Sequence, residues 1–240
     1  MTYKDRFFRN YQRTHLEPRK GKISTGSLKE TALRLEKSFR RFLPKDKAAV
    51  IIDAGCGYGA AVWWLHQLGY SNAEGIDVSP ELIETARTLG IAKVNEANLV
   101  TFLAQHADTY DLIFARDVLE HFSKDEIVEN LDLMYGALKQ GGTLVIQAPN
   151  GESPFGGRIR YGDFTHETAF TSSSLSQLLL MSGFVTVRTY PVQPPVVGLK
   201  SLVRFLMWKV AEACWRVVLT AETGRGTYVV TQNLIAVARK

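Results

Sequence analysis

The chain has 240 residues, of which 45% are hydrophobic and 22% are charged, which suits one domain with a substantial core. Its two cysteines, Cys56 and Cys214, have no metal-ligand spacing and argue against a disulfide framework or a zinc module. The first residues do not resemble a secretory signal, and no apolar run is long enough to span a membrane, so we expect a cytoplasmic protein.

The first element is a basic N-terminal arm with a helix, over residues 1–47. Residues 1–50 hold fourteen Lys and Arg against five Asp and Glu, whereas residues 51–240 hold fifteen against nineteen. A basic arm on a mildly acidic body can attract a phosphate-bearing partner, or it can be an ordinary solvated surface. The spacing of its basic residues matches no nucleic-acid motif, so we do not expect nucleic acid as a partner.

The larger domain, over 48–240, begins with alternating strand and helix patterns. We predict strands at 48–53, 73–79, 92–99, 110–116 and 143–150, and helices at 60–69, 79–90 and 124–142. A further helix and a sixth strand follow within 171–190, and 231–240 is predicted as the last strand. Repeated strand–helix units indicate a mostly parallel, doubly wound sheet with helices on both faces. Ligands bind beyond the carboxyl ends of the strands in such a sheet.

The first of these strand ends runs into a glycine-rich loop, "VIIDAGCGYGA", with glycine at 55, 57 and 59. Glycines at a strand–helix junction permit a tight turn and let a ligand approach the backbone closely. The expected ligand is therefore a nucleoside cofactor. The loop alone does not identify it, because Gly55, Gly57 and Ala60 also satisfy the relaxed dinucleotide pattern of nicotinamide-dependent oxidoreductases.

Two acids and several ordered motifs narrow the choice of cofactor. Asp53 lies just before the loop, and Asp77 ends the second strand, where an acid suits two ribose hydroxyls. The stretches "DAGCGYG", "GIDVSPELIETAR", "YDLIFARDVLEHF" and "ALKQGGTLVIQAPN" resemble, in this order, the motifs of class I S-adenosylmethionine (SAM)-dependent methyltransferases. The resemblance covers about 48–190. It implies a Rossmann-like seven-stranded sheet that closes with an antiparallel final strand.

The resemblance also implies a role for individual positions. Gly55, Cys56 and Gly57 would pass beneath the methionine part of SAM, and Asp53 would hold its amino end. The remaining cofactor positions are Asp77 at the ribose, with Val78 next to it in the chain, Asn98 and Leu99 at the adenine, and Ala115 and Arg116 at the sulfonium. Where the family often has an aspartate, this chain has Asn98, whose amide oxygen can still accept a hydrogen bond.

The methyl acceptor is predicted from the residues after the fourth strand. The chain has "ARDVLEHF" and not the Asn/Asp-Pro-Pro-aromatic signature of many N-methyltransferases, which favours an oxygen acceptor. A hydroxyl must lose its proton, and His121 and His166 are the candidate bases. Asp163 could orient His166 or ligate a cation with it, but two ligands do not predict a metal site, and metal dependence stays open. The loop also offers Arg158, Arg160 and Tyr161 to bind substrate.

Peripheral motifs extend the resemblance to methyltransferases of bacterial surface-polysaccharide synthesis. "THLEPRKG" in the arm and "SPFGGRIRYGDFTHE" carry this narrower likeness, which implies a sugar hydroxyl on a small-molecule, nucleotide-linked or lipid-linked saccharide. Two alternatives from other classes stay open. One is a nucleic-acid or protein methyltransferase, and the other is a SAM-binding protein without catalysis.

An insertion over 191–232 is expected between the last two strands, with an amphipathic helix at 199–219. One predicted face carries Leu202, Leu206, Val210, Ala213 and Val217, and the opposite arc carries Lys200, Arg204, Lys209, Glu212 and Arg216. Trp208 and Trp215 fall on the polar arc beside basic residues, which suits a membrane interface. The alternative is that the apolar face packs on the domain itself or on a second subunit in a homodimer.

Overall fold

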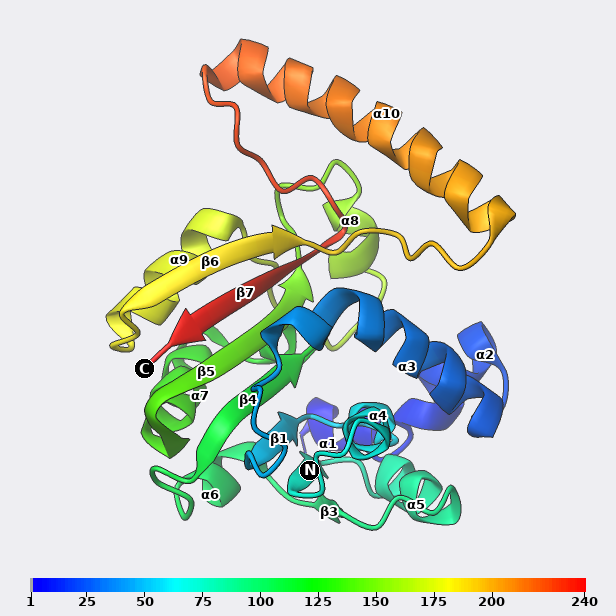
Figure 1. The fold of residues 1–240 in the computed structure, drawn as a ribbon, viewed down its shortest axis with the longest axis vertical. Coiled ribbons are helices and arrows are strands. Elements are labelled where there is room, and N and C mark those ends of the chain that lie inside the picture. Colours follow the sequence, from blue (N-terminus) through cyan, green and yellow to red (C-terminus); the bar gives the residue numbers. More distant parts are fainter. Residues whose placement is uncertain (1) are drawn as a thin grey trace.

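A single seven-stranded sheet organises the computed structural model, which describes residues 2–240. The strand order is β3-β2-β1-β4-β5-β7-β6 (Figure 1). The strands are β1 (Ile51–Ala54), β2 (Ala73–Asp77), β3 (Val94–Glu96), β4 (Tyr110–Arg116), β5 (Leu138–Pro149), β6 (Thr186–Pro191) and β7 (Asn233–Arg239). Strands β1 to β5 pair in parallel, whereas β7 lies antiparallel between β5 and β6. The predicted Rossmann-like sheet with an antiparallel final strand is confirmed.

Helices cover both faces of this sheet, and its central strands are therefore buried on both sides. Ile51 of β1 packs towards α3 and α4, whereas Ile52 packs towards α7 and α9, as successive side chains of a strand must. The longer helices are α3 (Thr25–Phe39), α4 (Ala60–Gln67), α5 (Pro80–Thr88), α7 (Lys124–Ala137), α9 (Ser172–Met181) and α10 (Leu199–Thr223). The short helices are α1 (Tyr3–Phe8), α2 (Glu17–Lys20), α6 (Leu99–Leu103) and α8 (Gly156–Arg160).

Two element boundaries differ from the sequence prediction. The helix predicted over 124–142 ends at Ala137, and β5 begins at Leu138. The two glycines that we interpreted as the stop of this helix, Gly141 and Gly142, therefore lie within the strand, next to a register shift between β4 and β5. The third strand is shorter than predicted, because Asn98 caps the short helix α6 with its side chain.

The beginning of the arm does not extend away from the body. Helix α1 and a π-helical turn at Gln12–Leu16 lie against the domain near the carboxyl ends of the strands. The Gln12 side chain accepts a hydrogen bond from Thr85, and the Gln12 N–H donates to Glu81 of α5. Further along the arm, α3 buries Leu35 and Phe39 against the sheet. The arm and the domain therefore share one core and one surface.

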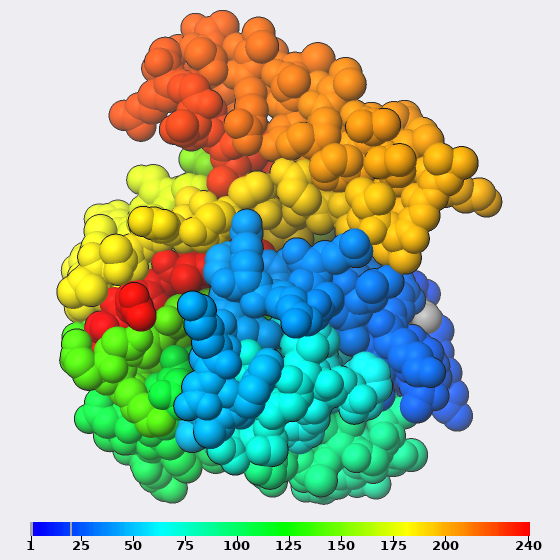
Figure 2. Space-filling model, in the orientation of Figure 1, coloured from blue at the N-terminus to red at the C-terminus, as the bar shows by residue number. Residues whose placement is uncertain are grey.

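Helix α10 stands apart from the sheet and forms a ridge along one end of the molecule (Figures 1 and 2). Its apolar face is turned outwards: Leu206 is 54% exposed, and Val210 and Val217 are similarly exposed. The side facing the body carries Trp208 and the buried Glu212, which Lys209 and Arg216 neutralise. The structure thus contradicts packing of the apolar face on its own domain. None of the described helices is long and apolar enough to cross a membrane.

Candidate active site

The glycine loop joins β1 to α4 at the carboxyl edge of the sheet. Gly55 has a φ of +76°, and a Cβ there would lie 2.3 Å from Cγ2 of Val118. A side chain at this position is therefore excluded both by backbone conformation and by contact. Gly57 also has a positive φ, +55°, but open space lies beside it. The loop surface at Gly57 is thus available to a ligand, as predicted for the cofactor.

Asp77 fixes this loop from the end of β2. Its Oδ2 accepts a hydrogen bond from the Gly57 N–H at 2.8 Å, and its Oδ1 accepts one from the Ser79 N–H at 2.8 Å. Burial raises the pKa of Asp77, although both of these hydrogen bonds favour the ionised carboxylate. Each oxygen retains lone pairs for further donors, such as a ribose diol. Val78, the next residue, is 46% exposed.

Asp53 and Arg116 form an ion pair across the ends of β1 and β4. The Arg116 guanidinium donates to both Asp53 oxygens, with Nη2–Oδ2 at 3.0 Å, and the Asp53 side chain is fully buried. The sequence prediction treated these two residues as separate contacts of the amino and sulfonium ends of SAM. The structure brings them together, because an isolated buried carboxylate would be costly and Arg116 compensates it.

The other predicted cofactor positions divide into backbone and side-chain groups. The Cys56 side chain is buried beneath the loop and turned towards Gly75 of β2, so only its backbone lines the loop. Ala115 is buried within β4. Asn98 uses its amide oxygen to cap α6, accepting from the N–H groups of Val100 and Thr101, whereas Leu99 is half-buried. The oxygen predicted to face the adenine is therefore engaged by the helix.

A second group of polar residues follows β4 in a short 3-10 turn, Leu119–His121. Glu120 is fully buried, and neither of its carboxylate oxygens has a hydrogen-bond partner among the described residues. The rings of His121 and His166 pack edge to face at 4.8 Å, and His166 Nε2 lies 4.0 Å from Glu120 Oε1. Both predicted histidines thus meet at one place. Val118 links this place to the cofactor loop, because it packs directly on Gly55.

Hydrogen bonds determine which nitrogen of each ring carries a lone pair. His166 Nδ1 lies 3.0 Å from the Ile159 carbonyl oxygen, which can only accept, so Nδ1 carries the proton. His121 Nδ1 lies 2.9 Å from the Thr165 hydroxyl, whose own proton is donated to Asp163. Nδ1 is therefore also the donor in His121. In the neutral form of both rings, Nε2 is left as the basic atom.

Burial keeps this histidine pair neutral. The pKa of His121 is lowered to about 4, mainly by burial and also by the neighbouring His166. The pKa of His166 is also lowered, again mainly by burial. Conversely, burial raises the pKa of the Glu120 carboxyl well above its usual range. The cluster therefore contains two neutral imidazoles that are able to accept a proton or a cation.

Asp163 occupies a different place from the one predicted. It accepts hydrogen bonds from the Thr165 N–H and hydroxyl and, at 2.6 Å, from the Tyr11 hydroxyl of the arm. Burial alone would raise the pKa of Asp163, but these hydrogen bonds outweigh it and lower the pKa to about 2. The backbone carbonyl of Asp163 accepts a hydrogen bond from the His166 N–H, but the His166 ring is bonded to the Ile159 carbonyl and not to the Asp163 carboxylate. Asp163 orients His121 through Thr165.

The predicted substrate-binding residues do not converge on the cluster. Arg160 donates to the backbone carbonyls of His166 and Glu167, so its guanidinium holds the loop in shape. Tyr161 is 81% exposed, and Arg158 is exposed on α8. Arg160 therefore supports the position of His166, while the other two face outwards.

The N-terminal arm covers the side of the site that carries the histidine pair. Phe7 stacks on Phe164 at 5.5 Å, and Phe8 packs edge to face on His121 at 5.6 Å. The Lys4 ammonium pairs with both Glu126 and Glu167 at 3.0 Å. The basic charge of this segment is thus partly engaged within the molecule.

Three residues of this site were not predicted from the sequence. Glu120 stands beside His121 in "VLEHF", and an acid next to a candidate base was a usable signal. Thr165 and Tyr11 gave no such signal, because their roles depend on a loop and an arm that are distant in sequence and adjacent only in the fold.

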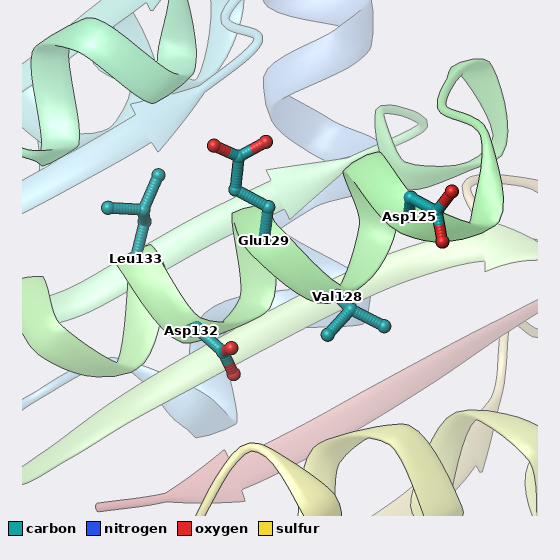
Figure 3. A pocket seen from close by; sticks show the side chains of 5 residues that line it. All are labelled: Asp125, Val128, Glu129, Asp132 and Leu133. Carbon is teal, nitrogen blue, oxygen red and sulfur yellow. The ribbon is translucent and has the colours of Figure 1, made fainter.

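A shallow hollow on the outer surface of α7 is a separate feature (Figure 3). It is lined by Asp125, Val128, Glu129, Asp132 and Leu133. The carboxylates of Glu129 and Asp132 point to different sides of the helix and do not converge on a common point (Figure 3). The carboxylates of this hollow could not act on one ligand together, and the hollow is not part of the candidate active site.

Comparison with known proteins assigns the chain to a family. A family described as a methyltransferase domain matches residues 28–189, which is more than half of the chain. The chain belongs to this family. It is therefore a SAM-dependent methyltransferase domain, and SAM is its cofactor.

Individual relatives are more distant. Over 127 residues the chain is 27% identical to phosphoethanolamine N-methyltransferase of Plasmodium falciparum, covering 52% of this chain and 46% of that protein. The chain thus spans about half the length of this curated relative. A SAM-dependent methyltransferase from Archaeoglobus fulgidus shares the fold with a TM-score of 0.69 and 21% identity, over 96% of this chain and 100% of that one.

A third relative was solved with ligands. The Haemonchus contortus phosphoethanolamine N-methyltransferase 2, in complex with phosphomonomethylethanolamine and S-adenosylhomocysteine, has a TM-score of 0.59 and 14% identity. The match covers 97% of this chain and 60% of that one. At these identities the structural likeness establishes the fold, while the acceptor of this chain has to be argued from its own residues.

Proposed function

We propose that this domain transfers the methyl group of SAM to a hydroxyl of a saccharide, either free, nucleotide-linked or lipid-linked. The observation that carries the proposal is the cluster of neutral His121 and His166 beside the buried Glu120. This cluster lies at the 3-10 turn that follows the carboxyl end of β4. An alcohol must give up a proton as it is methylated, so it needs basic atoms in this position.

Methyl transfer from a sulfonium is an in-line displacement. The acceptor oxygen forms a bond to the methyl carbon while the carbon–sulfur bond breaks. The electron pair of the broken carbon–sulfur bond stays on sulfur and gives the neutral thioether S-adenosylhomocysteine. The hydroxyl proton passes to Nε2 of His166 or of His121. Asp163 holds His121 through Thr165, and the Ile159 carbonyl holds His166. The rings are thus pre-oriented for this role.

The acceptor class is tested by offering purified protein and SAM to sugar nucleotides and to lipid-linked glycans. We expect a gain of one methyl group on a saccharide, located on oxygen by fragmentation. If the methyl group appears only on nitrogen, the proposal of an alcohol acceptor is wrong. Calorimetric titration with SAM and with NAD, run in parallel, separates a methyltransferase from a nicotinamide-dependent enzyme.

A second candidate is methylation of a small phosphorylated amine. The specific observation in its favour is the 27% identity with a phosphoethanolamine N-methyltransferase. Phosphoethanolamine therefore belongs in the same screen. Methyl transfer to it at a rate equal to or above that on any saccharide would favour this candidate over the sugar hydroxyl.

We also propose that α10 attaches the domain to an anionic lipid surface, which would bring it to a lipid-linked acceptor. Besides the exposed apolar side chains of Val203 and Leu206, the helix exposes two basic residues, Lys200 and Arg204. Apolar side chains that enter the headgroup region, with cations at its edge, suit peripheral binding. Trp208 takes no part, because its indole N–H is buried against the body.

Vesicle co-sedimentation tests the attachment. The protein is expected to pellet with phosphatidylserine-containing vesicles at low salt, and Leu206→Ser with Val210→Ser is expected to abolish pelleting. Trp208→Ser serves as the control on the same helix, because the indole N–H of Trp208 is buried. A wild-type protein that stays in the supernatant and forms a dimer, lost in the same double variant, would instead assign the face to a second subunit.

A further inference from the structure

The cluster beyond β4 has more ligand atoms than a proton transfer needs. Glu120, His121 and His166 each offer one ligand atom, and these atoms lie within 4.8 Å of one another. Glu120 and His121 come from the 3-10 turn, while His166 comes from the loop after α8. The fold therefore brings an acid and two imidazoles together from two separate segments.

The Glu120 carboxylate is the second, independent observation. It is fully buried, and both of its oxygens lack a hydrogen-bond partner among the described residues. A buried carboxyl group without a partner is unfavourable whether it is ionised or neutral. His166 Nε2 lies 4.0 Å from Glu120 Oε1, which is too far for a hydrogen bond. The imidazole and the carboxyl group therefore do not serve as hydrogen-bond partners for each other. A cation between them would satisfy both.

The orientation of the two rings is also that of metal ligands. Each ring donates its Nδ1–H to an oxygen, the Ile159 carbonyl for His166 and the Thr165 hydroxyl for His121. Metal-ligating histidines are fixed in this way by an outer partner, which leaves the other nitrogen for the ion. Among the described residues, neither ring has a hydrogen-bond partner at Nε2.

We propose that Glu120, His121 and His166 form a binding site for a divalent transition-metal ion. Ligands of one ion at about 2.0–2.2 Å lie about 3–3.5 Å apart, so the ligand atoms would have to approach by about 1 Å. Two imidazoles and a carboxylate suit Zn²⁺, Co²⁺, Mn²⁺ or Fe²⁺ better than Mg²⁺ or Ca²⁺, which prefer oxygen ligands. Three protein ligands leave coordination positions for a substrate oxygen.

The role of such an ion in catalysis rests on the proposed function, whereas its binding does not. An acceptor hydroxyl coordinated to the ion becomes more acidic and loses its proton to a water molecule. The resulting oxygen attacks the methyl carbon as the carbon–sulfur bond breaks. With the ion bound, His121 and His166 would be its ligands and would not accept the hydroxyl proton themselves. Removal of the ion by a chelator would then stop turnover without removing SAM.

Cobalt binding tests the site independently of any acceptor. The tag-free protein is dialysed against a chelator and titrated with Co²⁺, followed by visible absorption and by calorimetry. We expect saturable binding of one Co²⁺ per chain, displacement by Zn²⁺ but not by equal Mg²⁺, and a higher melting temperature. Glu120→Gln and His166→Gln are expected to weaken binding at least tenfold. His106→Gln is the matched control, because His106 is stacked on Phe102.

The wild-type protein alone can overturn the proposal. Absence of saturable Co²⁺ binding and of any shift in its melting temperature would do so, even if a variant failed to fold. Binding that Glu120→Gln and His166→Gln leave unchanged would also overturn it. SAM titration of the same samples separates the two proposals: lost Co²⁺ binding with intact SAM binding defeats the metal site only, whereas a wild-type protein without SAM affinity defeats the proposed function.

Discussion

The two ends of the active site are built in different ways. At the cofactor end, Gly57, Asp77 and Arg116 come from the ends of neighbouring parallel strands, and each lies within a short motif. At the acceptor end, His121 follows β4, His166 belongs to a distant loop, and Tyr11 reaches over from the arm. A shared cofactor can be held by local motifs. In the function that we propose, the acceptor is bound by segments that meet only in the folded chain.

The largest effect is expected from breaking the acceptor end. On the acceptor found in the screen, His166→Ala and His121→Ala should each lower turnover about 10²- to 10⁴-fold, because both remove a basic nitrogen next to the reacting oxygen. SAM affinity, measured by calorimetry, should change little. His106→Ala is the control of the same residue type outside the site. Full turnover in both active-site variants would mean that alignment alone suffices.

Breaking the cofactor end should have the opposite signature. Asp77→Ala removes the acceptor of the Gly57 N–H and, in our interpretation, of the ribose hydroxyls. Hydrogen bonds to a charged group contribute about 1.5–3 kcal/mol each, so the loss of the two bonds to the ribose hydroxyls should lower SAM affinity about 10²- to 10⁴-fold. Calorimetry measures the loss, and circular dichroism checks the fold. Undiminished SAM binding in the Asp77→Ala protein would contradict the assignment of this carboxylate to the cofactor.

The same contrast explains what the sequence could and could not predict. The parallel part of the sheet and the glycine loop follow from periodicity and from residues close together in the chain, whereas the antiparallel last strand was implied by the family resemblance. The orientation of Asp163 towards Thr165 depends on the conformation of the loop after α8. The pairing of Asp53 with Arg116 depends on β1 and β4 being neighbours in the sheet. The outward face of α10 also escaped prediction, because periodicity identifies an apolar face but not the direction in which it points.

A smaller effect is expected from Asp163, and it depends on pH. The folded pKa of about 2 lies below the value of 3.8 for a free Asp, so the ionised form stabilises the fold. This stabilisation, about 2 kcal/mol, is complete above pH 4 and is lost as the pH falls towards 2. Asp163→Asn should therefore unfold more easily at pH 7 by about this amount, with a shallower loss of stability between pH 4 and 2.

Denaturant unfolding at several pH values measures the Asp163 effect. Asp125→Asn is the matched control, because Asp125 is an exposed carboxylate on α7. A difference between Asp163→Asn and wild type that stays constant from pH 7 down to pH 2 would show that the carboxylate charge contributes nothing and that only the side-chain shape matters.

The smallest effect is expected from the hydrogen bond between the arm and Asp163. It tests directly whether the arm can open separately from the sheet. Tyr11→Phe removes the hydroxyl that donates to Asp163 at 2.6 Å but keeps the ring against His121. A hydrogen bond to a charged acceptor contributes about 1.5 kcal/mol, so the arm should open about tenfold more often. Hydrogen exchange of residues 3–16 should quicken by this factor, whereas exchange in β1 and β4 should not change. Tyr161→Phe, at an 81% exposed tyrosine, is the control. Faster exchange throughout the sheet would instead make the arm part of the global fold, and the separation between the two ends of the site would not hold.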